Sequence, residues 1–157
     1  MNTPEISHSM IIDVDFGAGV RVVMPSNIYG CKIGNDCFIG PFVEIQRGVV
    51  VGARTKIQSH AFLCEMVAIG EDCFISHGVM FINDAFRSGK TANRKTELWE
   101  PTKVGDRVLF GTNSTILPVQ ICSDVVIGAG SVVTKNILRP GFYFGNPARY
   151  MRAFGND

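Results

Sequence analysis

Four residues near the middle of the chain are the strongest candidates for chemistry. His60 and His77 can take up or release a proton near neutral pH, where imidazole titrates. Asn83 and Asp84 open a charged stretch, and they can hold a reacting group by hydrogen bonds. Each has a structural alternative: exposed corner positions for the histidines, and an Asx turn for the Asn-Asp pair. For His8, near an irregular N-terminus, we expect no catalytic role.

A six-residue repeat must position these side chains. Its first apolar column comprises Ile33, Ile39, Ile45, Val51, Ile57, Leu63, Ile69, Ile75 and Phe81. A second column of small or β-branched residues follows four positions later, at Cys37, Val43, Val49, Thr55, Ala61, Val67, Cys73 and Val79. A period of six fits neither a helix nor simple strand alternation. It is typical of a parallel β-helix, whose short faces stack coil upon coil.

The repeat is interrupted once. It resumes at Val104, Phe110 and Ile116 and, after a five-residue step, at Ile121, Ile127 and Val133; upstream it includes Val22 and Ile28. We therefore predict an all-β fold in one domain, 1–157, with coils from about 16 to 137. A loop excursion covers about 82–103, and a C-terminal tail about 138–157. Long excursions from a regular domain are often functional.

Three hexapeptides make a coil of 18 residues, so residues 18 apart should stack. His77 then stacks on Ser59, which places His60 and His77 on adjacent coils near a shared corner. Asn83 stacks over Glu65 in the same way. This arithmetic predicts that the histidines, Glu65 and the Asn-Asp pair lie on neighbouring coils, where the excursion leaves to build one wall of a site.

Composition and cysteine spacing limit the possible functions. The net charge is +1 without a basic block, which argues against nucleic-acid binding. No apolar run approaches the roughly 20 residues of a membrane span, and no signal peptide is apparent at the N-terminus. Cys37 and Cys73 are two coils apart, roughly 9.6 Å, too far for a disulfide. We expect the five cysteines to be buried, reduced thiols in a cytoplasmic protein, without a catalytic role.

Particular segments carry a family resemblance. The runs "IGNDCFIG", "IGEDCFIS" and "VIGAGSVVTKNI", followed by "GNPARYM", resemble the hexapeptide-repeat acyltransferases, which are left-handed parallel β-helices assembled as trimers. "HGVMFINDAF", "LWEPTKVG" and "GTNSTILP" more narrowly resemble N-acetyltransferases of nucleotide-linked amino sugars. The likeness runs from about Ile33 to Arg152. Members of this branch commonly carry a proline and an arginine after the Asn-Asp; this chain has Arg87 without the proline.

The resemblance implies acetyl-CoA as co-substrate, no metal, and a homotrimer with each site between two subunits. It implies an acceptor amine, the 3-amino group as the better choice, on a UDP- or dTDP-linked deoxy-amino sugar for surface polysaccharide. The expected catalytic residues are Asp84, Asn83, His77 and His60. Those expected to bind the sugar nucleotide are Glu65, Arg87 and Trp99, with Lys90, Arg94 or Lys95 as further phosphate contacts.

The acyl-CoA residues follow from the five-residue step. It makes one coil 17 residues long, which places Gly111 under Gly128 and Thr112 under Ala129. Small residues there would let a pantetheine arm approach the backbone edge, as the resemblance implies. The expected cofactor-binding residues are Gly111, Thr112, Ala129, Lys135 and Arg149. The alternative is that these glycines serve the turns alone.

A hexapeptide repeat is also compatible with other functions. An acyltransferase could act on another small acceptor, such as a serine, an antibiotic or a maltose-like sugar. A γ-class carbonic anhydrase shares the repeat but needs three histidines, two of them four or five residues apart, whereas His60 and His77 are 17 apart. A non-catalytic structural solenoid is the third alternative, and it would not bind acyl-CoA.

Overall fold

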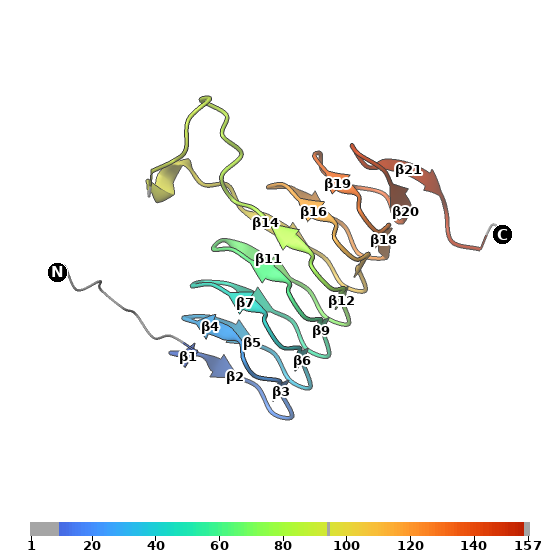
Figure 1. Ribbon diagram of the computed structural model, residues 1–157. Coiled ribbons are helices and arrows are strands. Elements are labelled where there is room, and N and C mark those ends of the chain that lie inside the picture. The colour runs from blue at the N-terminus through green and yellow to red at the C-terminus, as the bar shows by residue number, and fades with distance from the viewer. Residues whose placement is uncertain (1–9, 94, 156–157) are drawn as a thin grey trace.

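The computed structural model describes residues 10–93 and 95–155, and these form a parallel β-helix with three sheets as its faces (Figure 1). Face A stacks β1 (Ile11–Ile12), β4 (Asn27–Tyr29), β7 (Glu44–Ile45), β10 (Phe62–Leu63), β13 (Met80–Phe81), β16 (Thr115–Ile116) and β19 (Val132–Val133). Face B stacks β2 (Asp15–Phe16), β5 (Lys32–Ile33), β8 (Val50–Val51), β11 (Val67–Ile69), β14 (Thr102–Val104) and β17 (Gln120–Ile121).

Face C stacks β3 (Arg21–Val22), β6 (Phe38–Ile39), β9 (Lys56–Ile57), β12 (Phe74–Ile75), β15 (Leu109–Phe110) and β18 (Val125–Ile127). Two longer strands, β20 (Gly141–Phe144) and β21 (Arg149–Arg152), extend face C at the C-terminal end of the solenoid. They form an antiparallel pair in the tail, where the six-residue repeat had predicted no strand. The 3₁₀ helix η1 (Thr96–Leu98) lies in the excursion, so no helix of the described part is long enough to cross a membrane.

The core is the six-residue repeat. Every member of the first column from Ile33 to Phe81 is at most 4% exposed, and every member of the second is at most 2% exposed. The column continues at Val104, Phe110, Ile116, Ile121, Ile127 and Val133, all buried. Only Val22, near the open N-terminal end, is half-buried. The predicted repeat is therefore confirmed, and removal of this apolar surface from water stabilises the stack.

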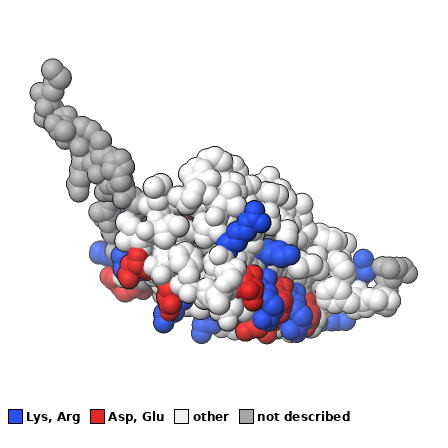
Figure 2. Space-filling view, turned by 90° about the horizontal axis from the view of Figure 1, so that it is seen from below, with Lys and Arg blue, Asp and Glu red and all other residues white. Residues whose placement is uncertain are grey.

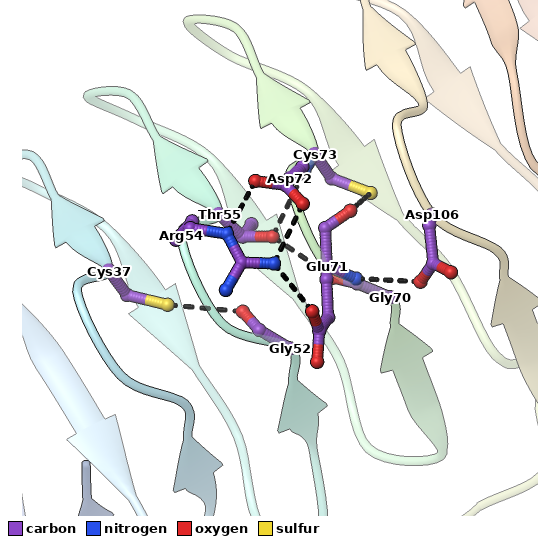
Figure 3. Close-up of polar contacts among 9 residues, drawn as sticks. All are labelled: Cys37, Gly52, Arg54, Thr55, Gly70, Glu71, Asp72, Cys73 and Asp106. Carbon is purple, nitrogen blue, oxygen red and sulfur yellow. Dashed lines mark hydrogen bonds and ion pairs between the residues drawn. The ribbon is translucent and has the colours of Figure 1, made fainter.

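Three corners join the faces, and we name each by the faces that it connects: C–A, A–B and B–C. The B–C corner carries oppositely charged pairs between successive coils. Arg54 pairs with Asp72 at 2.7 Å and with Glu71 at 2.6 Å (Figure 3). Arg107 pairs with Asp124 at 2.7 Å in the same way. Hydrogen bonds from the arginines lower the pKa of Asp72 and of Asp124. Figure 2 shows acidic and basic side chains interspersed along one edge of the molecule.

All five cysteines are free thiols, four of them buried, with Cys122 half-buried. Cys37 and Cys73 lie on one column with Thr55 between them, which confirms the predicted two-coil separation. The Cys37 thiol donates to the Gly52 carbonyl at 3.1 Å (Figure 3). Burial raises the pKa of all five thiols, that of Cys64 to about 12, so the cysteines stay protonated at neutral pH.

The excursion leaves the solenoid between β13 and β14, at the A–B corner, close to the predicted boundaries. It projects well away from the coils (Figure 1). Strand pairing continues across the insertion, because β14 stacks directly on β11, with Thr102 opposite Val67. The solenoid therefore keeps its register, and the loop is an addition to one corner.

Candidate active site

The C–A corner carries a column of four residues on successive coils: Ser59, His77, Thr112 and Ala129. Backbone hydrogen bonds of 3.1, 2.9 and 2.8 Å join each level to the next. The Ser59 hydroxyl lies 2.8 Å from His77 Nδ1. His77, Thr112 and Ala129 are exposed, so an imidazole and a small-residue edge face solvent together at one corner.

His60 lies at the same corner, one residue after Ser59. Its ring stacks on Phe42 with centroids 5.0 Å apart and planes 10° from parallel. A positive φ of 63° turns the backbone at His60. The structure thus confirms that His60 and His77 lie on adjacent coils at a shared corner.

Asn83 and Glu65 lie at the A–B corner, also stacked as the 18-residue offset predicts. The Asn83 side-chain amide donates to the Glu65 carbonyl at 3.2 Å. The Glu65 backbone N–H donates to the Gln46 side chain at 3.3 Å. Burial raises the pKa of the nearby Tyr29 phenol, and the negative charges of Glu44 and Glu65 raise it further.

Asp84 organises the base of the excursion. Its Oδ1 accepts the Phe86 N–H at 3.0 Å, which is an Asx turn, and its Oδ2 accepts the Ala92 N–H at 2.7 Å. Both carboxylate oxygens of Asp84 therefore accept hydrogen bonds from the backbone of the loop. The Asx turn, which is the structural alternative for the Asn-Asp pair, is therefore present. Each Asp84 carboxylate oxygen still has a second lone pair that can accept a hydrogen bond from another donor.

Further contacts close the loop. Arg87 makes a two-point ion pair with Glu100, one bond of which is 3.0 Å, and this pairing lowers the pKa of Glu100. The Glu100 N–H donates to the Asn83 carbonyl at 2.9 Å. Trp99, half-buried, follows η1 directly. A cavity of about 290 Å³ lies within the loop, lined among others by Asp84, Phe86, Arg87, Lys90, Leu98 and Glu100.

The predicted site residues therefore form two groups. His60 and His77 lie at the C–A corner, and Glu65, Asn83 and Asp84 lie at the A–B corner. They occupy neighbouring coils, as the arithmetic indicated, but β13 separates His77 from Asn83. A single chain does not bring the two groups together. The contact of the Ser59 hydroxyl with His77 was not predicted from the sequence. The 18-residue offset between Ser59 and His77 could have indicated it.

The residues expected to bind acyl-CoA differ in their surroundings, because some are packed and others are exposed. Gly111 stacks beneath Gly128, as predicted from the five-residue step. A Cβ at Gly111 would lie 2.3 Å from the Ala129 nitrogen, and at Gly128 the Phe144 ring occupies the corresponding space. Both glycines are therefore required by packing, which leaves Thr112 and Ala129 as the exposed edge.

The two expected cations lie apart. Arg149 on β21 pairs with Phe144, so it lies at the end of face C, one strand beyond the Phe144 ring that packs against Gly128. Lys135 lies two residues beyond Val133, at the A–B corner. Both side chains belong to exposed residues. Within residues 10–93 and 95–155, no group of three or more His, Cys, Asp and Glu residues could hold a metal ion.

Comparison with known proteins gives two matching family profiles. "Bacterial transferase hexapeptide (six repeats)" matches residues 30–64, and "Hexapeptide repeat of succinyl-transferase" matches residues 101–135. The chain belongs to the hexapeptide-repeat transferase family. Its fold is accordingly the left-handed parallel β-helix.

Family relatives include the bifunctional protein GlmU of Trichodesmium erythraeum (strain IMS101), 34% identical over 134 residues, or 84% of this chain and 25% of the relative. GlmU of Acaryochloris marina (strain MBIC 11017) is 29% identical over 135 residues, covering 85% of this chain and 27% of the relative. This hexapeptide-repeat chain thus spans only about a quarter of those relatives' length.

Solved structures of the family share the fold. A mutant of AntD, an N-acyltransferase from Bacillus cereus in complex with dTDP and coenzyme A, has a TM-score of 0.72 at 19% identity. That similarity covers 90% of this chain and 84% of AntD. Serine acetyltransferase of Neisseria gonorrhoeae has a TM-score of 0.58 at 28% identity, over 70% of this chain and 41% of that enzyme.

Proposed function

We propose that this protein is an acetyl-CoA-dependent N-acetyltransferase that acts on a UDP- or dTDP-linked deoxy-amino sugar, with a 3-amino group as the preferred acceptor. The observation that carries the proposal is the C–A corner. There His77, a candidate base, lies one coil from Thr112 and two from Ala129, the exposed edge suited to an acyl-CoA arm. The AntD complex with dTDP and coenzyme A supports the same pair of ligands.

In the proposed reaction, the sugar amine attacks the thioester carbonyl carbon of acetyl-CoA. A nitrogen–carbon bond forms, the carbon–sulfur bond breaks, and coenzyme A leaves. His77 takes the proton from the amine, directly or through water, and returns it to the leaving thiolate. His60 is the second candidate for this step. Backbone N–H groups at the coil edge would stabilise the developing oxyanion.

Asn83 and Asp84 have the positioning role in this proposal, and Glu65, Trp99 and the described loop cations Arg87, Lys90 and Lys95 line the acceptor's approach. Arg94 lies outside the described residues. Since Arg87 already pairs with Glu100, Lys90 at the loop cavity is the better placed contact for a phosphate. Arg149, at the end of face C that leads into the C–A corner, is likewise a better placed partner for the phosphates of coenzyme A than Lys135 at the A–B corner.

The separation of the two corners supports a homotrimer with each site between two subunits. The excursion carries exposed apolar side chains, Phe86 at 57% and Leu98 at 52%, which suit a surface that a neighbour covers. In such a trimer the loop of one subunit reaches the C–A corner of the next. Asn83 and Asp84 of one chain would then meet His77 of another.

Subunit mixing tests this arrangement. His77→Ala and Asn83→Ala subunits, each inactive alone, should form mixed trimers in which about a quarter of the sites combine both intact residues. Co-refolding the two variants should therefore restore roughly that fraction of wild-type activity. Light scattering at micromolar concentration gives the assembly state. A monomer, or no recovery in verified mixed trimers, would overturn the shared site.

Acetyl transfer to a panel of UDP- and dTDP-linked 3-amino and 4-amino sugars tests the substrate class. L-serine belongs in the panel as the other acceptor, because the 28% identity to a serine acetyltransferase favours it as the second candidate. Turnover of serine but of no amino sugar would replace the proposed acceptor. Isothermal titration with acetyl-CoA distinguishes the enzyme from a non-catalytic structural solenoid. Absence of binding would refute the proposed acetyltransferase activity.

Acetyl-CoA and nucleotide-linked sugars are cytoplasmic metabolites, so the proposed reaction takes place in the cytoplasm. The five free thiols fit that reducing compartment. Surface polysaccharide is the product class into which such an acetylated sugar would be built.

A further inference from the structure

We infer that Ser59 is a positioning residue for His77, an inference that rests on the proposed function of the C–A corner. Its hydroxyl oxygen would accept the Nδ1–H of His77 and so hold the tautomer in which Nε2 carries no proton. The free Nε2 would then be the atom that takes the proton from the acceptor amine.

Geometry supports this role. The Ser59 oxygen and His77 Nδ1 are 2.8 Å apart, within the normal range of a hydrogen bond. The two residues are fixed relative to one another, because the Gly78 N–H next to His77 donates to the Ser59 carbonyl at 3.1 Å. The hydrogen bond therefore joins two levels of a regular stack, and it limits rotation of an otherwise exposed imidazole.

The direction of the hydrogen bond follows from the proton transfer itself. Neutral imidazole has one N–H, and imidazolium has two. If Ser59 accepts from Nδ1–H, the bond persists when Nε2 becomes protonated, so the ring need not reorient during the reaction. If Ser59 instead donated to Nδ1, Nε2 would carry the proton in the neutral form and could not act as the base.

Ser59 provides the hydrogen bond to the His77 ring that the structure shows at this corner. His60 is the adjacent titratable group, and its ring stacks on Phe42. The Thr112 level is joined to His77 through a backbone bond, from the Asn113 N–H to the His77 carbonyl at 2.9 Å.

Substitution of Ser59 tests the inference. Ser59→Ala should lower kcat about tenfold, equivalent to about 1.4 kcal/mol, without raising KM for acetyl-CoA. Ser59→Thr keeps the hydroxyl and should recover most of the rate. In ¹⁵N NMR of the free protein, the His77 ring should shift from the Nδ1–H form toward the Nε2–H form in Ser59→Ala and stay unchanged in Ser59→Thr. The rate assay uses the panel's best nucleotide-linked amino sugar.

Ser123→Ala is the matched control. The Ser123 hydroxyl also links successive coils, by accepting the Asp106 N–H at 2.9 Å, but at the B–C corner. It should alter neither kcat nor the His77 signals.

Each failure has its own signature. Wild-type kcat in Ser59→Ala, or an unchanged His77 tautomer, overturns the positioning role while the transferase proposal stands. Wild-type turnover in His77→Ala removes His77 from the proposed mechanism. Acetylation of Ser59 itself by acetyl-CoA, detected by mass spectrometry, would make Ser59 a nucleophile and would also overturn the inference.

Discussion

Asp84→Asn should loosen the excursion without unfolding the solenoid. The carboxylate accepts two backbone N–H groups, from Phe86 at 3.0 Å and from Ala92 at 2.7 Å. An amide keeps one accepting oxygen and turns an NH₂ group toward the other donor, so one charge-assisted hydrogen bond is lost. Hydrogen bonds to charged groups contribute about 1.5–3 kcal/mol, and we expect loop closure to weaken by that amount.

Amide hydrogen exchange measures this effect directly. A loss of about 1.5–3 kcal/mol corresponds to about ten- to 150-fold faster exchange at Phe86 and Ala92. Exchange of the buried amides of β10 and β12 should not change, because the solenoid keeps its register across the insertion. The thermal midpoint should therefore stay close to that of the unmodified protein.

Asp106→Asn is the matched control, since the Asp106 carboxylate also accepts a backbone N–H, from Glu71 at 2.9 Å at the B–C corner (Figure 3). Because Asp106 accepts this single N–H and an amide keeps one accepting oxygen, exchange at Glu71 should change little, and the loop should be unaffected. Unchanged exchange at Phe86 and Ala92 in Asp84→Asn would refute the loop-organising role of Asp84. A fall in kcat without faster loop exchange would instead show that the carboxylate acts directly on the acceptor.

Three other perturbations have definite expected outcomes. Ala129→Phe should raise KM for acetyl-CoA with an unchanged thermal midpoint, and an unchanged KM would place the acyl-CoA path elsewhere. Arg54→Met should make stability less dependent on acidic pH. Arg54 lowers the pKa of Asp72, so the ion pair stabilises the folded protein above about pH 3.8, and this stabilisation is lost as the pH falls further. Thermal midpoints at pH 5 and pH 3 measure this difference. The free energy of unfolding should fall above about pH 9, because the Cys64 thiol ionises there in the unfolded chain, whereas burial holds its pKa near 12 in the folded protein. Urea titrations at pH 8 and pH 10 measure this fall, and Cys64→Ala should reduce it.

The solenoid could be predicted because its packing repeats. Side chains such as those of Ile57 and Ile75 point into the interior of the β-helix and must be apolar, so the buried positions recur at a fixed spacing in the sequence. The five-residue step could be interpreted in the same way, and it placed Gly111 beneath Gly128 correctly. Where one side of every strand is buried, a shift of register would expose the core.

The C-terminal hairpin could not be predicted by that reasoning. β20 and β21 pair antiparallel and follow no six-residue period. Their contacts depend on particular side chains: Tyr143 stacks edge-on against Tyr150, and the Arg152 guanidinium lies 4.1 Å from the centre of the Phe142 ring. Such pairs depend on how the tail folds back over the last coil, a geometry that spacing alone does not specify.

The division of the candidate site between two corners has a simple geometric cause. An offset of 18 residues identifies neighbours along the axis, as it did for Ser59 and His77, but it does not say how far apart two residues lie around a coil. Six residues make one face, and Asn83 follows His77 by six, so the two must lie at successive corners. Asp84 is further fixed there by its two loop hydrogen bonds. This separation is the reason why we propose that each site lies between two subunits.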